Sequence, residues 1–118
     1  MYKINLEKKT IDNKNYRKIL HTTKQMQLVV MRLLSGEDID RERHPSITQF
    51  IRVEKGIIQA TVDDKKTILK DGDCCIIPAG HWHYIKNIGK HPAYLYTIYS
   101  PPEHEEHLVQ RNKPIENS

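Results

Sequence analysis

Turn-forming residues interrupt the chain at short and regular intervals, and this spacing restricts the folds open to it. Gly, Pro, Asp and Lys gather at 35–36, 54–56, 63–66, 71–73, 78–80 and 89–92. The segments between these positions have strand length and are rich in β-branched and aromatic residues. Outside the C-terminal tail, no helical period continues beyond about two turns. The pattern predicts an all-β sandwich or barrel of antiparallel strands.

The predicted strands follow directly from these interruptions. We expect them at 25–34, 47–53, 57–62, 67–70, 74–77, 81–87 and 93–99. Alternation along 47–53 places Gln49 on the same face as Ile51 and Val53. The final strand leaves two inward-facing sets open: Tyr94, Tyr96 and Ile98, or Leu95, Thr97 and Tyr99.

The division of the chain into segments is equally simple. Its 118 residues suit one domain, which we place at 16–102. Residues 1–15 are polar and without a clear period, so we expect a loosely held arm that supplies an edge strand. Residues 103–118 form a charged tail that we expect to lie over the surface.

Composition excludes several classes of partner. The net charge of +4 comes from basic residues interspersed with acidic ones, so we expect no nucleic acid partner. No apolar run approaches the ~20 residues that span a bilayer, and the lysine-rich start lacks the apolar core of a signal peptide. Cys74 and Cys75 are adjacent and have no other cysteine to pair with. These features predict a cytoplasmic protein without a membrane partner.

The first segment with chemical potential lies between the glycines of 36–56. It contains Glu42, His44 and Gln49. On a strand, Glu42 and His44 point to the same face because they are two residues apart. Pro45 then allows the chain to bend and to bring Gln49 back to the same interior from the next strand.

The second segment, 72–87, begins with glycine and contains a rigid Pro-Ala-Gly turn at 78–80. His83 follows this turn and can point into the interior. His81 has the same parity, but it comes directly after the turn, so we place it at a loop tip. Trp82 should point away from the interior.

Together the two segments resemble the two sequence motifs of the cupin superfamily. The first family motif carries His-x-His and then Glu between its glycines, and the second carries Pro-x-Gly, His and Asn. The resemblance covers roughly residues 25–100 and implies a double-stranded β-helix, the jelly-roll or cupin barrel. The whole chain is similar to small single-domain cupins of the mannose-6-phosphate isomerase-like group, particularly at 44–50 and 96–104.

The resemblance implies a metal site at Glu42, His44, Gln49 and His83, although two of these positions depart from the family pattern. Glu42 replaces the first His of the motif, and Gln49 replaces its Glu. The set still carries one negative charge, as the usual three His and one Glu do. Two imidazoles and a carboxylate suit one divalent ion, Fe, Mn, Ni, Co or Zn, with open positions for a ligand. Gln49 ligates directly or acts from outside the ligand shell.

Other side chains compete with this interpretation. His104 and His107 have a helical spacing among acidic residues, and we interpret them as part of a solvated tail. An independent acid or base near the metal would indicate catalysis, and Tyr96, His81, Arg32 and Glu103 are the candidates.

Three functions remain open at this point. The first is a metal-dependent enzyme of dioxygenase or isomerase type that acts on a small molecule. The second is a non-catalytic module that binds a sugar or carboxylate through the metal, and the third is a metal-free scaffold. This fold hosts many reactions and cannot choose among them. The apolar and aromatic surplus on short strands further predicts a homodimer.

Overall fold

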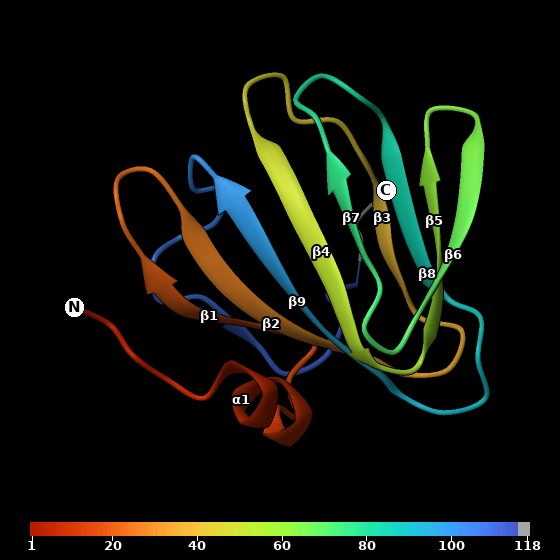
Figure 1. The fold of residues 1–118 in the computed structure, drawn as a ribbon, viewed down its shortest axis with the longest axis horizontal. Coiled ribbons are helices and arrows are strands. Elements are labelled where there is room, and N and C mark those ends of the chain that lie inside the picture. Colours follow the sequence, from red (N-terminus) through yellow and green to blue (C-terminus); the bar gives the residue numbers. More distant parts are fainter. Residues whose placement is uncertain (116–118) are drawn as a thin grey trace.

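The computed structural model describes residues 1–115 and consists of two antiparallel sheets that face each other (Figure 1). The larger sheet has the strand order β10-β1-β2-β9-β4-β7, and the smaller one has the order β3-β8-β5-β6. This arrangement confirms the predicted jelly-roll barrel. The elements are α1 (Leu6–Asp12), β1 (Arg17–Thr22), β2 (Gln27–Leu33), β3 (Asp38–Glu42), β4 (Thr48–Lys55), β5 (Ile57–Val62), β6 (Lys65–Lys70), β7 (Cys74–Ile77), β8 (His83–Asn87), β9 (Ala93–Ser100) and β10 (Val109–Gln110).

The core lies between the two sheets and is built from alternate residues of the strands. Val29, Met31 and Leu33 of β2 are fully buried there. On β9, the inward set is the one that contains Leu95, Thr97 and Tyr99, all of them without exposed surface. The other β9 set faces outward, where Tyr96 lies against Phe50 with 6.1 Å between ring centroids. The structure thus chooses between the two sets that the sequence left open.

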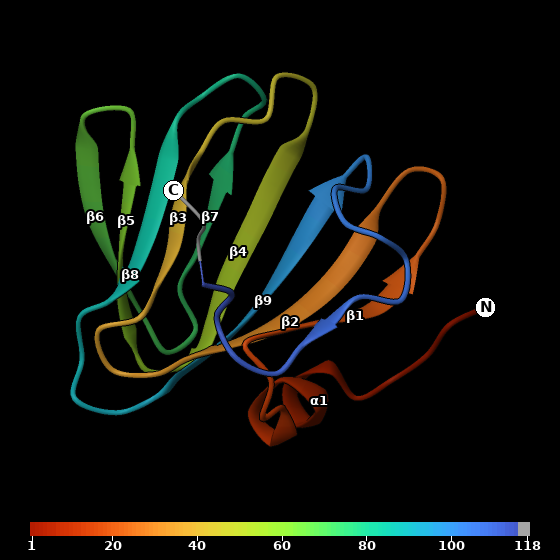
Figure 2. The same cartoon turned by 180° about the vertical axis from the view of Figure 1, so that it is seen from behind.

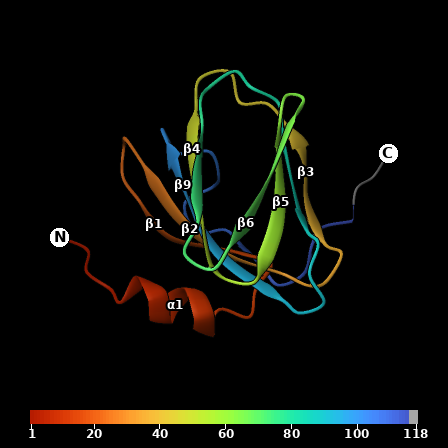
Figure 3. The same ribbon diagram turned by 45° about the vertical axis from the view of Figure 1, so that its right-hand side comes forward.

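The N-terminal arm is a helix rather than the expected edge strand. The side chain of Asn5 caps α1 by accepting a hydrogen bond from the backbone N–H of Lys8 at 3.0 Å. Figure 3 shows α1 outside the larger sheet, where it packs against β2, β4 and β9 and buries Thr10 completely. The arm escaped prediction because a helix of less than two turns leaves almost no periodic signal. Within residues 1–115, no helix has the length and apolarity to cross a bilayer.

The C-terminal segment does more than lie over the surface. β10 pairs with β1, through Arg17 opposite Gln110 and Lys18 opposite Val109. Lys113 then forms ion pairs with Asp38 and Asp40 of the smaller sheet. Figure 2 shows this segment running from the larger sheet toward β3 and joining the two sheets on one side of the barrel. Residues 116–118 of the predicted tail lie outside the described residues.

Gly56 marks the point where the chain passes from the larger sheet into the smaller one. It has a φ of +118°, and a Cβ placed there would lie 2.9 Å from Cα of Ala93. We expect Gly56→Ala to lower the free energy of unfolding by roughly 2–4 kcal/mol, through backbone strain and overlap. Gly72 has a φ of +86° and open space around it, so Gly72→Ala should cost only about 1 kcal/mol. Urea denaturation of both variants measures the difference, and equal losses would contradict the overlap.

Candidate metal centre

Glu42 and His83 meet because β3 and β8 are neighbours in the smaller sheet. The two residues are cross-strand partners in the antiparallel ladder, after a register shift that follows Ile39. Side chains of directly opposed residues lie on the same face of a sheet. The His83 side chain is buried, with 3% of its surface exposed, whereas one third of the Glu42 side chain reaches solvent. The pair therefore places one imidazole and one carboxylate at an accessible end of the barrel.

His44 joins this pair from the loop that follows β3. Its carbonyl accepts a hydrogen bond from the N–H of Gly80 at 2.8 Å, which ties the loop to the turn before His83. Its Nε2 lies 3.9 Å from Oε2 of Glu42, and its ring centroid lies 5.2 Å from that of His83. Ligand atoms of Glu42, His44 and His83 all lie within 4.8 Å of one another. Three of the four residues predicted from the sequence thus form one cluster.

Gln49, the fourth predicted residue, belongs to the opposite sheet. It lies on β4 between Ile77 of β7 and Tyr99 of β9, and it shares the inner face with Ile51 and Val53 as predicted. Only 2% of its surface is exposed, and its Oε1 has no hydrogen-bond partner among the described residues. Tyr99, its cross-strand partner, lies edge-on to the His44 ring at 6.2 Å. A free amide oxygen therefore faces the interior from the sheet opposite the cluster.

Both imidazoles are held so that Nε2 is free. The Nδ1 of His83 lies 3.3 Å from the carbonyl oxygen of His81, which can only accept, so this nitrogen carries the proton. The Nδ1 of His44 lies 3.2 Å from the carboxylate Oε2 of Glu103, which fixes the same tautomer. Both Nε2 atoms are buried and have no hydrogen-bond partner in residues 1–115. Each ring therefore keeps an unused lone pair on the side of the cluster.

The electrostatics of the cluster favour a neutral His83 ring. Burial lowers the pKa of His83, and the charge of His44 adds to this effect, while the hydrogen bond to His81 opposes it. Burial raises the pKa of Glu42, with His44 and Arg17 opposing the shift. A neutral imidazole is the form that binds a metal ion, because protonation removes its lone pair. The residues present thus match the chemistry of a divalent metal site in charge, tautomer and free lone pairs.

Glu103 and His104 reach the site from the C-terminal segment, contrary to the expectation of a solvated tail for His104. The side chain of Gln27, fully buried on β2, holds this segment. Its Oε1 accepts from the backbone N–H groups of Glu103 and His104 at 3.3 and 2.9 Å, and its Nε2 donates to the carbonyl of His104 at 2.8 Å. The His104 ring then lies edge-on to Tyr99 at 5.0 Å. The one sequence signal for this contact was the family resemblance across 96–104.

His81 and Trp82 lie outside the cluster, as the sequence predicted. The Nδ1 of His81 is 2.7 Å from Oδ2 of Asp63, in an exposed pair at the turn. Trp82 points to the other side of β8, where the guanidinium of Arg41 lies 4.4 Å from its ring centroid. His81 is therefore not a member of the ligand cluster.

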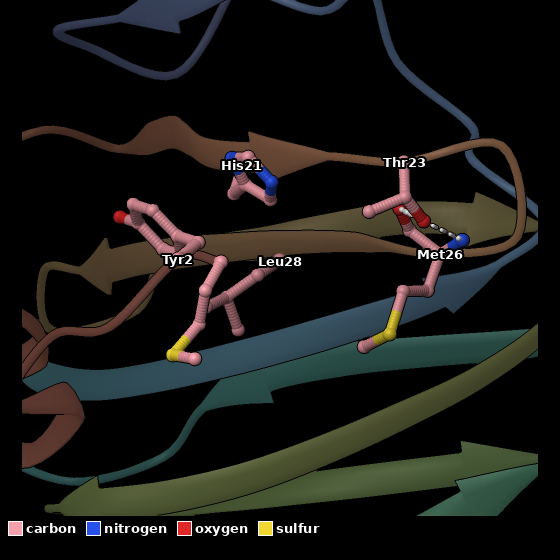
Figure 4. A pocket seen from close by; sticks show the side chains of 6 residues that line it. Tyr2, His21, Thr23, Met26 and Leu28 are labelled. Carbon is pink, nitrogen blue, oxygen red and sulfur yellow. Dashed lines mark hydrogen bonds between the residues drawn. The ribbon is translucent and has the colours of Figure 1, made fainter.

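A separate hollow lies on the outer face of the larger sheet. Figure 4 shows it lined by Tyr2, His21, Thr23, Met26 and Leu28, and Met1 completes the lining. The Tyr2 and His21 rings stack there with centroids 4.3 Å apart. Because Leu28 alternates with the inward-facing Val29, this hollow faces away from the barrel interior. It is a different surface from the cluster of Glu42, His44 and His83.

Two facing antiparallel sheets with a His and carboxylate cluster at one end define a jelly-roll protein with a candidate metal centre. The family model described as a cupin domain matches residues 29–99. This chain belongs to the cupin family. Its C-terminal segment, which supplies Glu103 and His104, lies beyond the matched residues.

Similar proteins are found in a virus and in bacteria. Protein L612 of Acanthamoeba polyphaga mimivirus is 40% identical over 119 residues, which cover 97% of this chain and 74% of that protein. YrkC of Bacillus subtilis (strain 168) is 36% identical over 116 residues, which cover 93% of this chain but only 62% of YrkC. The solved structure of BH2720 from Bacillus halodurans has a TM-score of 0.92 at 34% identity, covering 93% of this chain and 88% of that one.

The half-buried position of the His104 ring should make the protein less stable in acid. Burial lowers its pKa from 6.5 to about 4, with the charges of Arg17 and His44 contributing. The unfolded chain therefore binds more protons than the folded one in this interval, so the free energy of unfolding falls as pH drops below about 6.5. We expect this loss, measured by urea denaturation at about pH 7.5 and about pH 5.5 in EDTA, to be smaller in His104→Asn than in wild type.

The matched control for this experiment is His107→Asn, because the His107 side chain is 83% exposed. This control should show the same loss of stability in acid as wild type. An identical loss in all three proteins would contradict the buried, neutral state of His104.

Proposed function

We propose that the barrel binds one divalent metal ion through Glu42, His44 and His83, with Gln49 as the fourth ligand, and that this centre acts on a small molecule. The observation that carries the proposal is the set of three buried atoms without a partner: Nε2 of His44, Nε2 of His83 and Oε1 of Gln49. A buried acceptor without a partner costs about 1–3 kcal/mol, and ligation of a cation removes this cost. In its full form, the proposal is that the metal-loaded protein is an enzyme of dioxygenase or isomerase type.

The residues of the chain divide the work of such a site. Glu42 supplies the one negative charge of the ligand set and is the ligand most open to solvent, with 33% of its side chain exposed. His44 and His83 supply neutral nitrogens that are oriented by Glu103 and by the His81 carbonyl. A bound divalent ion supplies Lewis acidity and open coordination positions. The ligands stand on both sheets, so the packing of the barrel fixes their mutual positions.

Metal content tests the ligand set directly. We expect protein exposed to Fe, Mn, Ni, Co or Zn and then desalted to retain close to one ion per chain, measured by mass spectrometry of the dissolved ions. His83→Ala should lose most of this metal, because no other imidazole faces the cluster from that strand. His81→Ala is the matched control and should keep the wild-type content, since His81 pairs with Asp63 on the outside.

Two results would count against the proposed site. Full metal content in His83→Ala together with loss in His81→Ala would mean that the ligand assignment is wrong. Failure of the wild type to retain any of the five metals would favour the metal-free scaffold. Circular dichroism on each variant separates loss of metal from loss of the fold.

Glu103 provides a second test, because it holds the ring of His44 without belonging to the cluster. Removing a carboxylate that orients a ligating imidazole costs about 10- to 100-fold in metal affinity. We expect a loss of this size for Glu103→Ala in a competition titration with a metal-binding dye. Glu106→Ala is the control, since Glu106 is 66% exposed and pairs only with the exposed His107. Equal affinities in the two variants would remove Glu103 from the site.

One observation favours a second function, metal-dependent binding of a small molecule without turnover. Glu103 is a nearby carboxylate outside the cluster, but its Oε2 already pairs with Nδ1 of His44 and is therefore less available as a general base. Burial raises the pKa of Tyr99 to about 12, so its hydroxyl is a poor proton acceptor near neutral pH. Turnover assays with small carboxylates and sugars, run beside binding measurements on the same metal-loaded protein, distinguish an enzyme from a binding module.

A further inference from the structure

Next to the metal cluster, the rings of Tyr99 and His104 continue along the inner face of the barrel. We call the part of this face formed by Tyr99, His104 and Arg17 the inner wall. The His83 ring lies 5.2 Å from that of His44, which lies 6.2 Å from that of Tyr99, and Tyr99 lies 5.0 Å from His104. The hydroxyl of Tyr99 and the Nε2 of His104 are both buried. The hydroxyl interacts with the Thr97 side chain on the same face of β9, whereas Nε2 of His104 has no hydrogen-bond partner in residues 1–115. Tyr99 and His104 therefore extend the site by two polar atoms that the proposed ligand set does not use.

Arg17 is a buried positive charge that lies close enough to Tyr99, His104 and Glu42 for its field to act on all three. It lies on β1 on the inward side, as Ile19 does, and only 8% of its surface is exposed. One guanidinium nitrogen, Nη1, donates to Oε1 of Gln110 at 2.6 Å, whereas Nε has no partner in the described chain. No carboxylate of residues 1–115 forms an ion pair with Arg17 within 4.0 Å. A buried cation without a counter-ion is costly unless an anion is brought to it.

The charges around the wall indicate what kind of ligand would suit it. A divalent ion and Arg17 together carry three positive charges, and Glu42 and Glu103 carry two negative ones. The remaining charge of +1 is matched by a monoanion. The hydroxyl of Tyr99 is buried on the inner face of the barrel, and a phenolic O–H can donate a hydrogen bond. Arg17 Nε and the Tyr99 hydroxyl are thus donors suited to an acceptor oxygen such as that of a carboxylate.

We propose that Arg17, Tyr99 and His104 form a subsite that binds the carboxylate group of a small monoanionic ligand beside the metal ion. This inference rests on the proposed metal centre and names the class of molecule on which that centre acts. Arg17 donates from Nε to the carboxylate, Tyr99 donates from its hydroxyl, and the neutral His104 ring donates or accepts through Nε2.

Acetate is the probe, and the Nε–H resonance of Arg17 is the direct readout. In ¹⁵N-labelled, zinc-loaded protein, we expect sodium acetate to shift this resonance in a saturable way. Sodium chloride at the same ionic strength and the neutral isostere acetamide should leave it in place. The resonance is assigned by its absence from Arg17→Gln. Metal analysis of the same sample shows independently whether zinc is bound.

Three variants measure how much the side chains of the inner wall contribute to acetate affinity. Arg17→Gln should weaken acetate binding on the order of tenfold, because it removes a charged donor. Tyr99→Phe, which removes only the buried hydroxyl and keeps the ring, should weaken acetate binding several-fold. Lys18→Gln, the neighbouring charge on the exposed side of β1, should leave acetate affinity within about twofold, since solvent and salt screen that charge.

The outcomes separate the two proposals. If zinc binds but acetate does not shift the Arg17 resonance, the carboxylate subsite is wrong while the metal centre stands. Acetate binding in a folded Arg17→Gln or Tyr99→Phe protein at wild-type strength would also overturn it. If zinc does not bind, the metal centre fails and the subsite fails with it.

Discussion

Buried lone pairs that the protein does not satisfy are the constraint around which this barrel is organised. Two imidazoles and one amide oxygen lie inside it, with buried acceptor atoms that no donor of residues 1–115 reaches. Their burial opposes folding by about 1–3 kcal/mol each. The rest of the inner faces is lined mainly by buried aliphatic and aromatic side chains, and their packing offsets the cost. The barrel thus combines an apolar interior with a polar cluster whose positions the two sheets fix.

The position of the negative charge distinguishes this site from the family motif it resembles. The carboxylate stands on β3 as Glu42, in the smaller sheet, and the amide stands on β4 as Gln49, in the larger sheet. The carboxylate is therefore the more exposed of the two groups, at the accessible end of the barrel, while the neutral amide is almost fully buried. The site thus has its negative charge at the entrance and a neutral oxygen in the interior. In the family motif, the carboxylate stands at the position that Gln49 occupies here.

The sequence predicted the fold and the three members of the cluster because each rested on a local pattern. Alternation placed Gln49 inward, and the fixed turn at 78–80 placed His83. The helix α1 was missed because seven residues are too few to establish a period. His104 was misjudged because its burial depends on Gln27, which lies far away in the sequence. Contacts of this kind are made by tertiary structure and leave no trace in local composition. The same is true of Arg17, whose guanidinium is held by Gln110 of the C-terminal segment.

Gln27 has a consequence for anyone who sets out to engineer this protein. A fully buried amide at the start of an apolar strand is a position that a core redesign would readily replace with leucine or methionine. The replacement would improve the apolar packing locally, yet it would leave two backbone N–H groups and one carbonyl of the C-terminal segment without partners. It would also release Glu103 from the ring of His44. A screen that treats this amide as a flaw would therefore select substitutions that disturb the candidate metal centre, although Gln27 is not one of its proposed ligands.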